Sequence, residues 1–250
     1  MYKSKILFAV TGLLAGLIIG FFVANALNRG EVDKARSELA RLRAAETARN
    51  NEKSGEPSKS ALTDDEIRNA IAAADARPDD LSLQRKLGLS LYLYSGQTPQ
   101  PFYLEDVVRL LQRAATGDGK DYEVIIALAN VLFDIAQTSD PRRFTEARGY
   151  YLKALEIKPD DANARTDLGL TYYLGQPSEP QRAISEYRRS LLIDPRHELT
   201  LENLATALMS TGQRDEARRR IEELSALNPA HPSLPGLRAQ LARGEVSHQE

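Results

Sequence analysis

The chain has 250 residues, 42% of them hydrophobic and 27% charged, which is a globular composition long enough for one or two domains. Its formal net charge of -2 argues against a general nucleic-acid surface, because non-specific binding of phosphate backbones needs an excess of Lys and Arg on one face. The chain has no Cys, which excludes disulfides, thiolate metal sites and a Cys nucleophile.

The N-terminus predicts a membrane segment. Residues 1–5 form a short basic segment with two lysines, and residues 6–27 are apolar except for two polar residues and three glycines. A helix over this run would extend roughly 33 Å, enough for a bilayer core of about 30 Å. Residues 24–26 resemble a signal-peptidase site, so a cleaved signal peptide is the alternative. The run exceeds the usual apolar core of a signal peptide, about 7 to 15 residues, which favours a retained transmembrane helix acting as a signal-anchor.

The orientation of this anchor follows from the length of the domain behind it. Long domains cross the membrane largely regardless of their charge, so the short basic N-terminus is expected to stay inside. We therefore expect a single-pass protein of the cytoplasmic (inner) membrane with an extracytoplasmic domain, periplasmic if the source is a Gram-negative bacterium. Arg29, Lys34 and Arg36 follow the span as closely as the two lysines precede it, which leaves the orientation open.

Two patterns near the anchor suggest a parallel homodimer. Gly12, Gly16 and Gly20 lie on one face of the predicted transmembrane helix, as in helices that pack closely in membranes. Residues 28–46 predict a juxtamembrane helix whose apolar residues have the spacing of a possible short coiled coil. The alternative is a monomeric anchor followed by a charged helix.

The next two segments separate the anchor from the folded domain. Residues 47–61 are polar and lack apolar periodicity, so they predict a flexible linker. Residues 62–80 begin with Thr63 and Glu66 in the spacing of a helix capping box, next to Leu62 and Ile67 as its hydrophobic staple. This segment predicts a half-repeat that covers the end of a repeat array.

From residue 81 onward the same residue types return at a fixed spacing. In residues 162–197 large side chains stand where two helices would meet, small ones where their backbones would approach, and a proline where the second helix must stop. These are Leu168, Gly169, Tyr172, Ala183, Tyr187 and Pro195. The phase predicts helix-turn-helix repeats at 81–121, 122–161, 162–197 and 198–231, then a capping helix at 232–243 and a tail at 244–250. Extra residues fall in the turns at 96–102, 138–143 and 176–180.

These residues resemble the tetratricopeptide repeat, a unit of about 34 residues. The resemblance implies an all-α fold, in which an N-terminal transmembrane helix precedes an α-solenoid of helix-turn-helix repeats. The Trp usual in the first helix of this family is replaced in every repeat, by Gln84, Ile125, Arg165 and Leu201.

The resemblance also implies a peptide-binding groove, because the first helices of such repeats line a concave surface. One position facing that groove gives Arg85, Ile126, Thr166 and Glu202. A second gives Leu89, Asn130, Leu170 and Thr206, and a third gives Tyr92, Phe133, Tyr173 and Met209. The alternative is that Tyr92 and Tyr173 pack against neighbouring helices. The family's carboxylate clamp is mostly missing, with Arg85, Lys86, Asn130 and Asn203 as its only remnants.

The sequence has no recognisable catalytic or metal-binding motif. The three histidines, His197, His231 and His248, have no ligand spacing, and no Ser lies in a GxSxG elbow. Residues 117–120 read Gly-Asp-Gly-Lys but lack the rest of a phosphate loop, so they predict an inter-repeat turn. Residues 78–80 and 159–161 read Pro-Asp-Asp, a helix stop followed by an acidic cap. We expect no enzyme, no cofactor, no metal and no small-molecule substrate.

The function expected from these patterns is binding. The favoured hypothesis is a membrane-anchored scaffold or adaptor that holds a peptide or protein partner in its groove while a membrane-associated complex assembles. Anchor plus repeats also resembles bacterial cytochrome c biogenesis proteins, which present apocytochrome to the haem-attachment machinery. A permanent structural subunit of an envelope or pilus assembly complex is a further alternative.

Overall fold

The computed structural model describes residues 63–96 and 103–246 of the chain. The N-terminal segment, the transmembrane helix at 6–27 with its packing glycines, the juxtamembrane coiled coil and the linker lie outside these residues and stay predictions. Within the described ranges, none of the helices combines the length and the apolar character that crossing a membrane requires. The described helices belong to one compact unit, residues 64–250.

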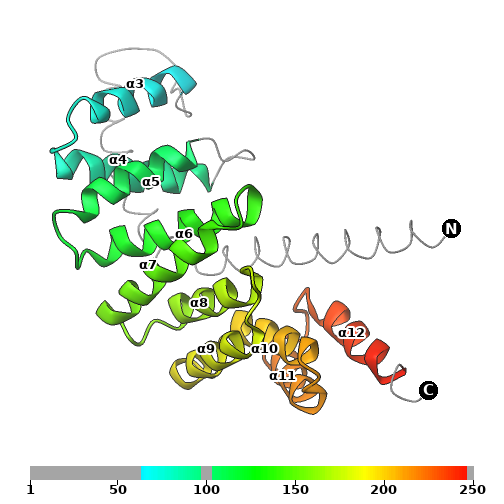
Figure 1. The fold of residues 1–250 in the computed structure, drawn as a ribbon. Helices are drawn as coiled ribbons and strands as arrows, with labels where there is room; N and C mark the ends of the chain where they lie inside the picture. The colour runs from blue at the N-terminus through cyan, green and yellow to red at the C-terminus, as the bar shows by residue number, and fades with distance from the viewer. Residues whose placement is uncertain (1–62, 97–102, 247–250) are drawn as a thin grey trace, which may run out of the picture. The chain divides into compact units, whose positions relative to one another are not determined.

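Every regular element in the described ranges is an α-helix, and Figure 1 shows these helices stacked in chain order. They are α3 (Asp64–Asp75), α4 (Leu81–Ser95), α5 (Leu104–Ala115), α6 (Tyr122–Thr138), α7 (Arg143–Ile157), α8 (Ala162–Leu174), α9 (Pro180–Ile193), α10 (Glu198–Ser210), α11 (Arg214–Leu227) and α12 (Leu234–Val246).

The helices pack in consecutive pairs. The pairs α4 and α5, α6 and α7, α8 and α9, and α10 and α11 make the most extensive contacts, and each pair also contacts the next one along the chain. Helix α3 packs on α4, and α12 packs on α10 and α11, so the array is covered at both ends. The predicted all-α solenoid is confirmed for the described part of the chain.

Aspartate residues fix where three of the four first helices begin, α4, α6 and α8. The side chains of Asp80, Asp121 and Asp161 accept hydrogen bonds from the backbone N–H groups three residues ahead, at 3.0, 3.2 and 2.8 Å. Each bond satisfies an N–H that the first turn of a helix leaves without a partner. The interpretation of the two Pro-Asp-Asp segments as a helix stop and cap is therefore confirmed.

Glycines in the first helices make room for large side chains of the second helices. A Cβ atom at Gly169 would lie 2.5 Å from Cε1 of Tyr187, and one at Gly88 would lie 2.7 Å from Cδ2 of Leu111. Both distances are too short for any side chain, so the ring of Tyr187 and the end of Leu111 occupy the space that the glycines leave. The pairing of small and large residues in the sequence has this physical cause.

The position that usually carries Trp is filled differently in each repeat. Ile125 and Leu201 are buried among apolar side chains. Gln84 is also buried, and its amide donates to the carbonyl oxygens of Ala74 at 2.8 Å and Arg77 at 2.9 Å, which ties α4 to α3 and the turn after it. Arg165 forms an ion pair with Glu186 at 3.1 Å, joining α8 to α9.

The extra residues of the second repeat do not all form a turn. Helix α6 has 17 residues, whereas α8 and α10 have 13 each, so the expected insertion at 138–143 partly lengthens the helix. The prediction of a longer turn there is therefore corrected. The chain leaves α6 at Ser139, whose N–H donates to the carbonyl of Ile135, and reaches α7 after four residues, 139–142.

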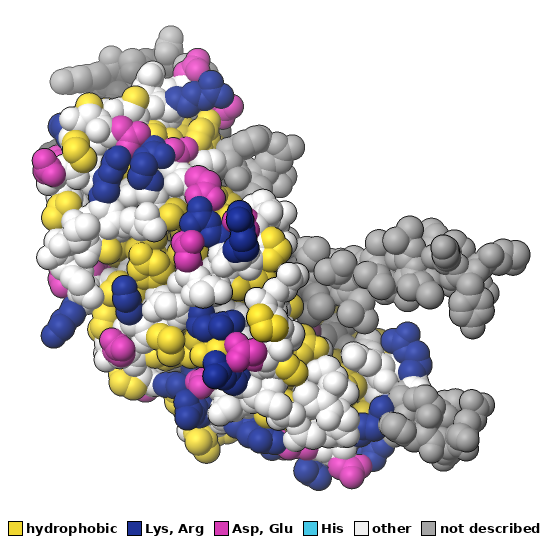
Figure 2. Space-filling view, viewed as in Figure 1, with side chains coloured by type: hydrophobic (Ala, Val, Ile, Leu, Met, Phe, Trp, Pro, Cys, Tyr) yellow, Lys and Arg dark blue, Asp and Glu magenta, His cyan; other side chains and the backbone are white. Residues whose placement is uncertain are grey.

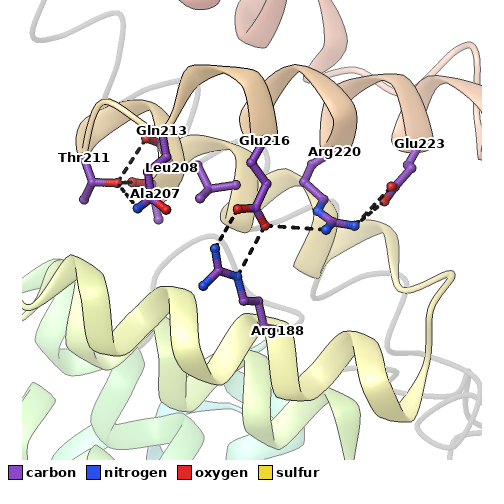
Figure 3. A network of polar contacts seen from close by, with 8 residues as sticks. All are labelled: Arg188, Ala207, Leu208, Thr211, Gln213, Glu216, Arg220 and Glu223. Atoms are coloured by element: carbon purple, nitrogen blue, oxygen red, sulfur yellow. Dashed lines mark hydrogen bonds and ion pairs between the residues drawn. The ribbon is translucent and has the colours of Figure 1, made fainter.

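Ion pairs join the second helices of the last two repeats. Arg188 on α9 donates to both carboxylate oxygens of Glu216 on α11, at 3.3 and 2.6 Å, and Arg220 bridges Glu216 and Glu223 (Figure 3). Basic and acidic side chains are interspersed over the face shown in Figure 2. Much of the charge on the second helices is thus paired within the protein.

Candidate functional site

Two pairs of first helices are in contact, α4 with α6 and α8 with α10. Most of the side chains predicted to face the groove lie on these helices and are half-buried. They are Arg85, Leu89, Tyr92, Ile126, Asn130, Tyr173, Glu202, Thr206 and Met209.

Three of the predicted groove residues lie instead in the core, because Phe133, Thr166 and Leu170 are 1%, 0% and 5% exposed. The ring of Phe133 packs edge-on against Phe144 and Tyr151, with centroids 5.4 and 6.4 Å apart. These three side chains pack against other residues of the chain and are not part of the candidate site.

Thr166 belongs to a buried polar cluster that joins α8, α9 and α10. Its hydroxyl lies 2.6 Å from that of Thr200 and 2.9 Å from that of Ser190. His197 completes the cluster, because its Nε2 donates to Oδ1 of Asn163 at 2.7 Å and its Nδ1 therefore accepts from the Thr200 hydroxyl at 2.5 Å. Burial lowers the pKa of His197, so the ring is neutral in this cluster.

Two further residues that were predicted to face the groove make contacts between neighbouring units of the array. Arg85 donates to Asp121 at 2.6 Å and to Glu123 at 2.5 Å, and the hydrogen bond to Asp121 raises the pKa of the guanidinium. The charge of Arg85 is therefore neutralised by acidic residues at the junction of the first two repeats. Because Arg85 is already paired, little of the family's carboxylate clamp remains. Glu202 is hydrogen-bonded to Ser233, the residue before α12, and burial raises the pKa of Glu202 to about 7.

A chain of hydrogen bonds crosses the first two repeats. The Tyr151 hydroxyl on α7 donates to Oδ1 of Asn130 on α6 at 2.8 Å. Asn130 is also hydrogen-bonded to the Tyr92 hydroxyl on α4. Burial raises the pKa values of both phenols well above their usual range, so both keep their protons. The amide that was predicted to hold a peptide is thus positioned by two tyrosines.

Two acidic residues that the sequence interpretation missed lie beside this chain. Asp134 on α6 and Asp167 on α8 are half-buried, and neither carboxyl makes a hydrogen bond or ion pair within the described residues. Burial raises the pKa of Asp134 to about 7 and that of Asp167 to about 8. Their charges also raise the pKa of Tyr92, and that of Asp134 raises the pKa of Asp167, so the three groups lie near one another.

A signal for these acids was present in the sequence. Asp134 follows Phe133, and Asp167 follows Thr166, both of which were assigned to the groove. A charged residue that shares the inward side of an amphipathic helix breaks the usual pattern of apolar residues inside and charged residues outside. Such a break points to function or to a buried ion pair, and neither acid has a basic partner in the described part of the chain.

The hydroxyl of Tyr187 is a third group without a partner. Tyr187 occupies the position in the third repeat that Tyr151 occupies in the second, and its hydroxyl is buried without a hydrogen bond. The residue aligned with Asn130 is Leu170, which offers no acceptor. Tyr173 and Asp167 lie close enough for their charges to raise the pKa of Tyr187 further above its usual range.

We call Tyr92, Asn130, Asp134, Asp167 and Tyr173 the first-helix face. It offers two carboxyl groups, an amide and phenol rings, a set that accepts hydrogen bonds and packs against extended or flat groups. In the residues that the structure describes, no group of three or more His, Cys, Asp or Glu side chains is arranged to hold a metal ion.

Comparisons with known proteins bear on this fold. Residues 176–241 match the family model of the tetratricopeptide repeat. A crystal structure of MamA is similar over 66% of this chain and 87% of its own, with a TM-score of 0.54 and 21% identity. A structure of YrrB, described as a TPR protein with an unusual peptide-binding site, is similar over 70% of this chain and 84% of its own, with a TM-score of 0.56 and 16% identity.

The described helices have the tetratricopeptide-repeat (TPR) fold. A double mutant of MamA from RS-1 is similar to this chain over 78% of the chain's length and 97% of that protein's, with a TM-score of 0.55 and 15% identity. At such identities the likeness is one of fold. No curated protein matches the sequence.

Proposed function

We propose that this protein is a membrane-anchored TPR scaffold that binds an extended peptide segment of a partner protein on its first-helix face, while a membrane-associated complex assembles. The observation that carries the proposal is the pair of half-buried carboxyls on that face, Asp134 and Asp167, which have no partner among the described residues. Half-buried carboxyls without partners cost folding free energy, because burial disfavours their charged form. A ligand that donates hydrogen bonds to Asp134 and Asp167 would offset that cost.

The aromatic side chains of the same face support a peptide as the ligand. Tyr92 and Tyr173 are half-buried, so their rings retain surface for a partner to cover. Tyrosine supplies a large contact area at a low cost in conformational entropy. The fold gives further support, since YrrB shares it and is described as having a peptide-binding site. The proposal assigns no catalytic activity to the chain.

The membrane part of the proposal rests on the apolar run at 6–27. We expect the full chain to stay in the membrane fraction after alkaline extraction, and a chain that starts at residue 28 to appear in the supernatant. Protease added to spheroplasts should degrade the TPR domain if it lies outside the cytoplasm. Release of the full chain by alkaline extraction would contradict the anchor.

Site-specific crosslinking in membranes tests the binding surface. A photoreactive amino acid in place of Tyr173 should capture one or a few proteins. The control is the same substitution at Leu192 on the second helix α9, which is 84% exposed and far more accessible than Tyr173. Capture at Leu192 of the same proteins with equal yield would contradict a recognition surface on the first helices.

The crosslinking experiment also separates the alternatives. A scaffold should release its captured partner region to an excess of the corresponding free peptide, whereas a permanent structural subunit should co-purify with a fixed partner that no peptide displaces. Capture of only the same chain at Tyr173 would indicate self-assembly. No feature of the described residues favours an apocytochrome over another partner, so we do not propose that role.

A further inference from the structure

We infer that the peptide bound by the first-helix face is basic, with the cationic group of a Lys or Arg side chain bound between Asp134 and Asp167 and its stem against Tyr92. This inference rests on the proposed function and specifies the chemistry of its ligand. It follows from three observations on α4, α6, α8 and α9.

The first observation is the position of the two carboxyl groups. Asp134 and Asp167 come from the first helices of consecutive repeats, and both are close enough to Tyr92 on α4 for their charges to act on its hydroxyl. Neither carboxyl has a partner among the described residues, and both keep some exposure to solvent. Two carboxyls held near each other in this way repel when ionised, and a cation between them would relieve the repulsion.

The second observation concerns a hydroxyl group on α9. The Tyr187 hydroxyl is fully buried beneath α8 and has no hydrogen-bond partner, and both Asp167 and Tyr173 lie close to it. Its counterpart Tyr151 has its acceptor within the chain, on Asn130. A buried hydroxyl without a partner is rare in folded proteins, and here it lies next to the unpaired acid of the same repeat.

The third observation is that the two arginines of the first helices are already paired. Arg85 on α4 is bound to Asp121 and Glu123, and Arg165 on α8 is bound to Glu186 and to the carbonyl of Pro159. Each of these cations therefore already has its anion. No basic side chain of the described residues pairs with Asp134 or Asp167, so we assign the complementary charge to a ligand.

The chemical groups of the site favour a side chain over a small ion. Guanidinium carries five N–H donors in a planar fork, and both guanidinium and ammonium groups stand on long apolar stems. Two carboxyls beside a phenol ring offer acceptors for the donors and an apolar surface for the stem. An extended peptide with Arg or Lys fits this arrangement of groups.

Paired peptides that differ only in charge test the inference. The test peptide is a fluorescein-labelled peptide of alternating Ala and Ser with two central Arg residues. The control peptide has citrulline in place of each Arg. The full chain in detergent micelles is titrated into each peptide. Citrulline has the shape of Arg without its charge. Fluorescence anisotropy at mildly alkaline pH should give a dissociation constant about tenfold lower for the Arg peptide, as expected of a charge-assisted hydrogen bond.

Three variants locate the effect. Asp134→Asn and Asp167→Asn should each remove most of the preference for Arg over citrulline. The control is Asp160→Asn, in the exposed turn before α8. It removes one negative charge outside the first-helix face and should retain the preference for Arg. Far-ultraviolet circular dichroism of each variant shows whether its helices are intact before binding is compared.

The results separate this inference from the proposed function. If the Arg and citrulline peptides bind equally well, or if only the citrulline peptide binds, the inference is overturned while peptide binding stands. If neither binds but Tyr173 still captures a partner in membranes, the inference is again overturned and the scaffold role stands. If neither binds and Tyr173 captures nothing, both fail.

Discussion

Tyr151 and Tyr187 occupy equivalent positions, yet only the Tyr151 hydroxyl donates a hydrogen bond within the described structure. Tyr151→Phe should therefore lower the free energy of unfolding by about 1 kcal/mol, because Asn130 loses a buried donor. Tyr187→Phe should leave the free energy of unfolding unchanged or raise it, because the hydroxyl it removes has no partner. Urea denaturation of both variants measures the difference, and equal losses would show that the Tyr187 hydroxyl is satisfied in the folded protein.

Leu168 and Tyr173 lie on the same helix but in different environments. Leu168 is 1% exposed, so Leu168→Ala should cost about 2 to 5 kcal/mol of stability through lost contacts and the cavity left behind. Tyr173 is half-buried, so Tyr173→Ala should change stability by about 0.5 kcal/mol or less and should weaken ligand binding. A large fall in the melting temperature of Tyr173→Ala would place its ring in the core and remove it from the site.

The acids of the first-helix face should make the protein less stable at alkaline pH. Burial raises the pKa values of Asp134 and Asp167 from 3.8 to about 7 and about 8, so these groups hold their protons more tightly in the folded chain. Their favourable contribution is fully present below pH 3.8 and is lost as pH rises through these raised values. Asp134→Asn and Asp167→Asn should each gain stability of the order of 1 kcal/mol over wild type at alkaline pH.

The gain of each Asn variant should shrink steadily as the pH falls below these raised pKa values, and it should vanish only near pH 3.8. Chemical denaturation at several pH values checks this, with Asp160→Asn as the control that should show little gain at any pH. A gain that is the same at every pH would mean that the two carboxyls are not desolvated in the folded chain.

At the scale of whole helices, the hydroxyl cluster makes the junction of α8, α9 and α10 sensitive to acid. Burial lowers the pKa of His197 below its ordinary value of 6.5, so the neutral ring stabilises the folded chain above that pH. This contribution is lost as the pH falls through 6.5 and then through the lower value in the folded state. The stability advantage of wild type over His197→Gln should therefore decrease from neutral pH to about pH 5.

Wild type and His197→Gln both contain Asp134 and Asp167, whose raised pKa values change stability with pH in the opposite direction. Subtracting one stability curve from the other cancels this shared effect. Guanidinium denaturation in a series of buffers gives the two curves. A constant difference across the series would mean that His197 titrates alike in the folded and unfolded chains.

Helices were predictable where a local rule determined them. A proline that stops one helix and an aspartate that caps the next are visible in the sequence, and Asp80 and Asp161 act as expected. The match of Gly169 to Tyr187 was visible for the same reason, since each repeat carries its own small and large residues.

What failed was the assignment of faces by position within the repeat. The pattern treats every first helix alike, but α6 is longer than its counterparts, and the ring of Phe133 packs inward on Phe144 and Tyr151. Asp134 and Asp167 were missed because a search for apolar periodicity gives no weight to an acid that has no partner nearby.

At the scale of the whole chain, neighbouring repeats are joined by different chemistry. An ion pair of Arg85 with Asp121 lies at the first junction, and a cluster of hydroxyls around Thr200 lies at the last. A repeat protein has stability that depends on each junction separately, so unequal junctions can open separately. No sequence repeat predicts this, because the residues at the junctions are those that differ between repeats.

The two unpaired carboxyls have a consequence for the energetics of binding. Because Asp134 and Asp167 hold protons near neutral pH, a cation that binds their charged forms expels those protons into solution. The heat measured by titration calorimetry should then depend on the ionisation enthalpy of the buffer, and the affinity should fall as the solution becomes more acidic. Occupancy of the first-helix face would thereby follow the acidity of the compartment into which the repeats project.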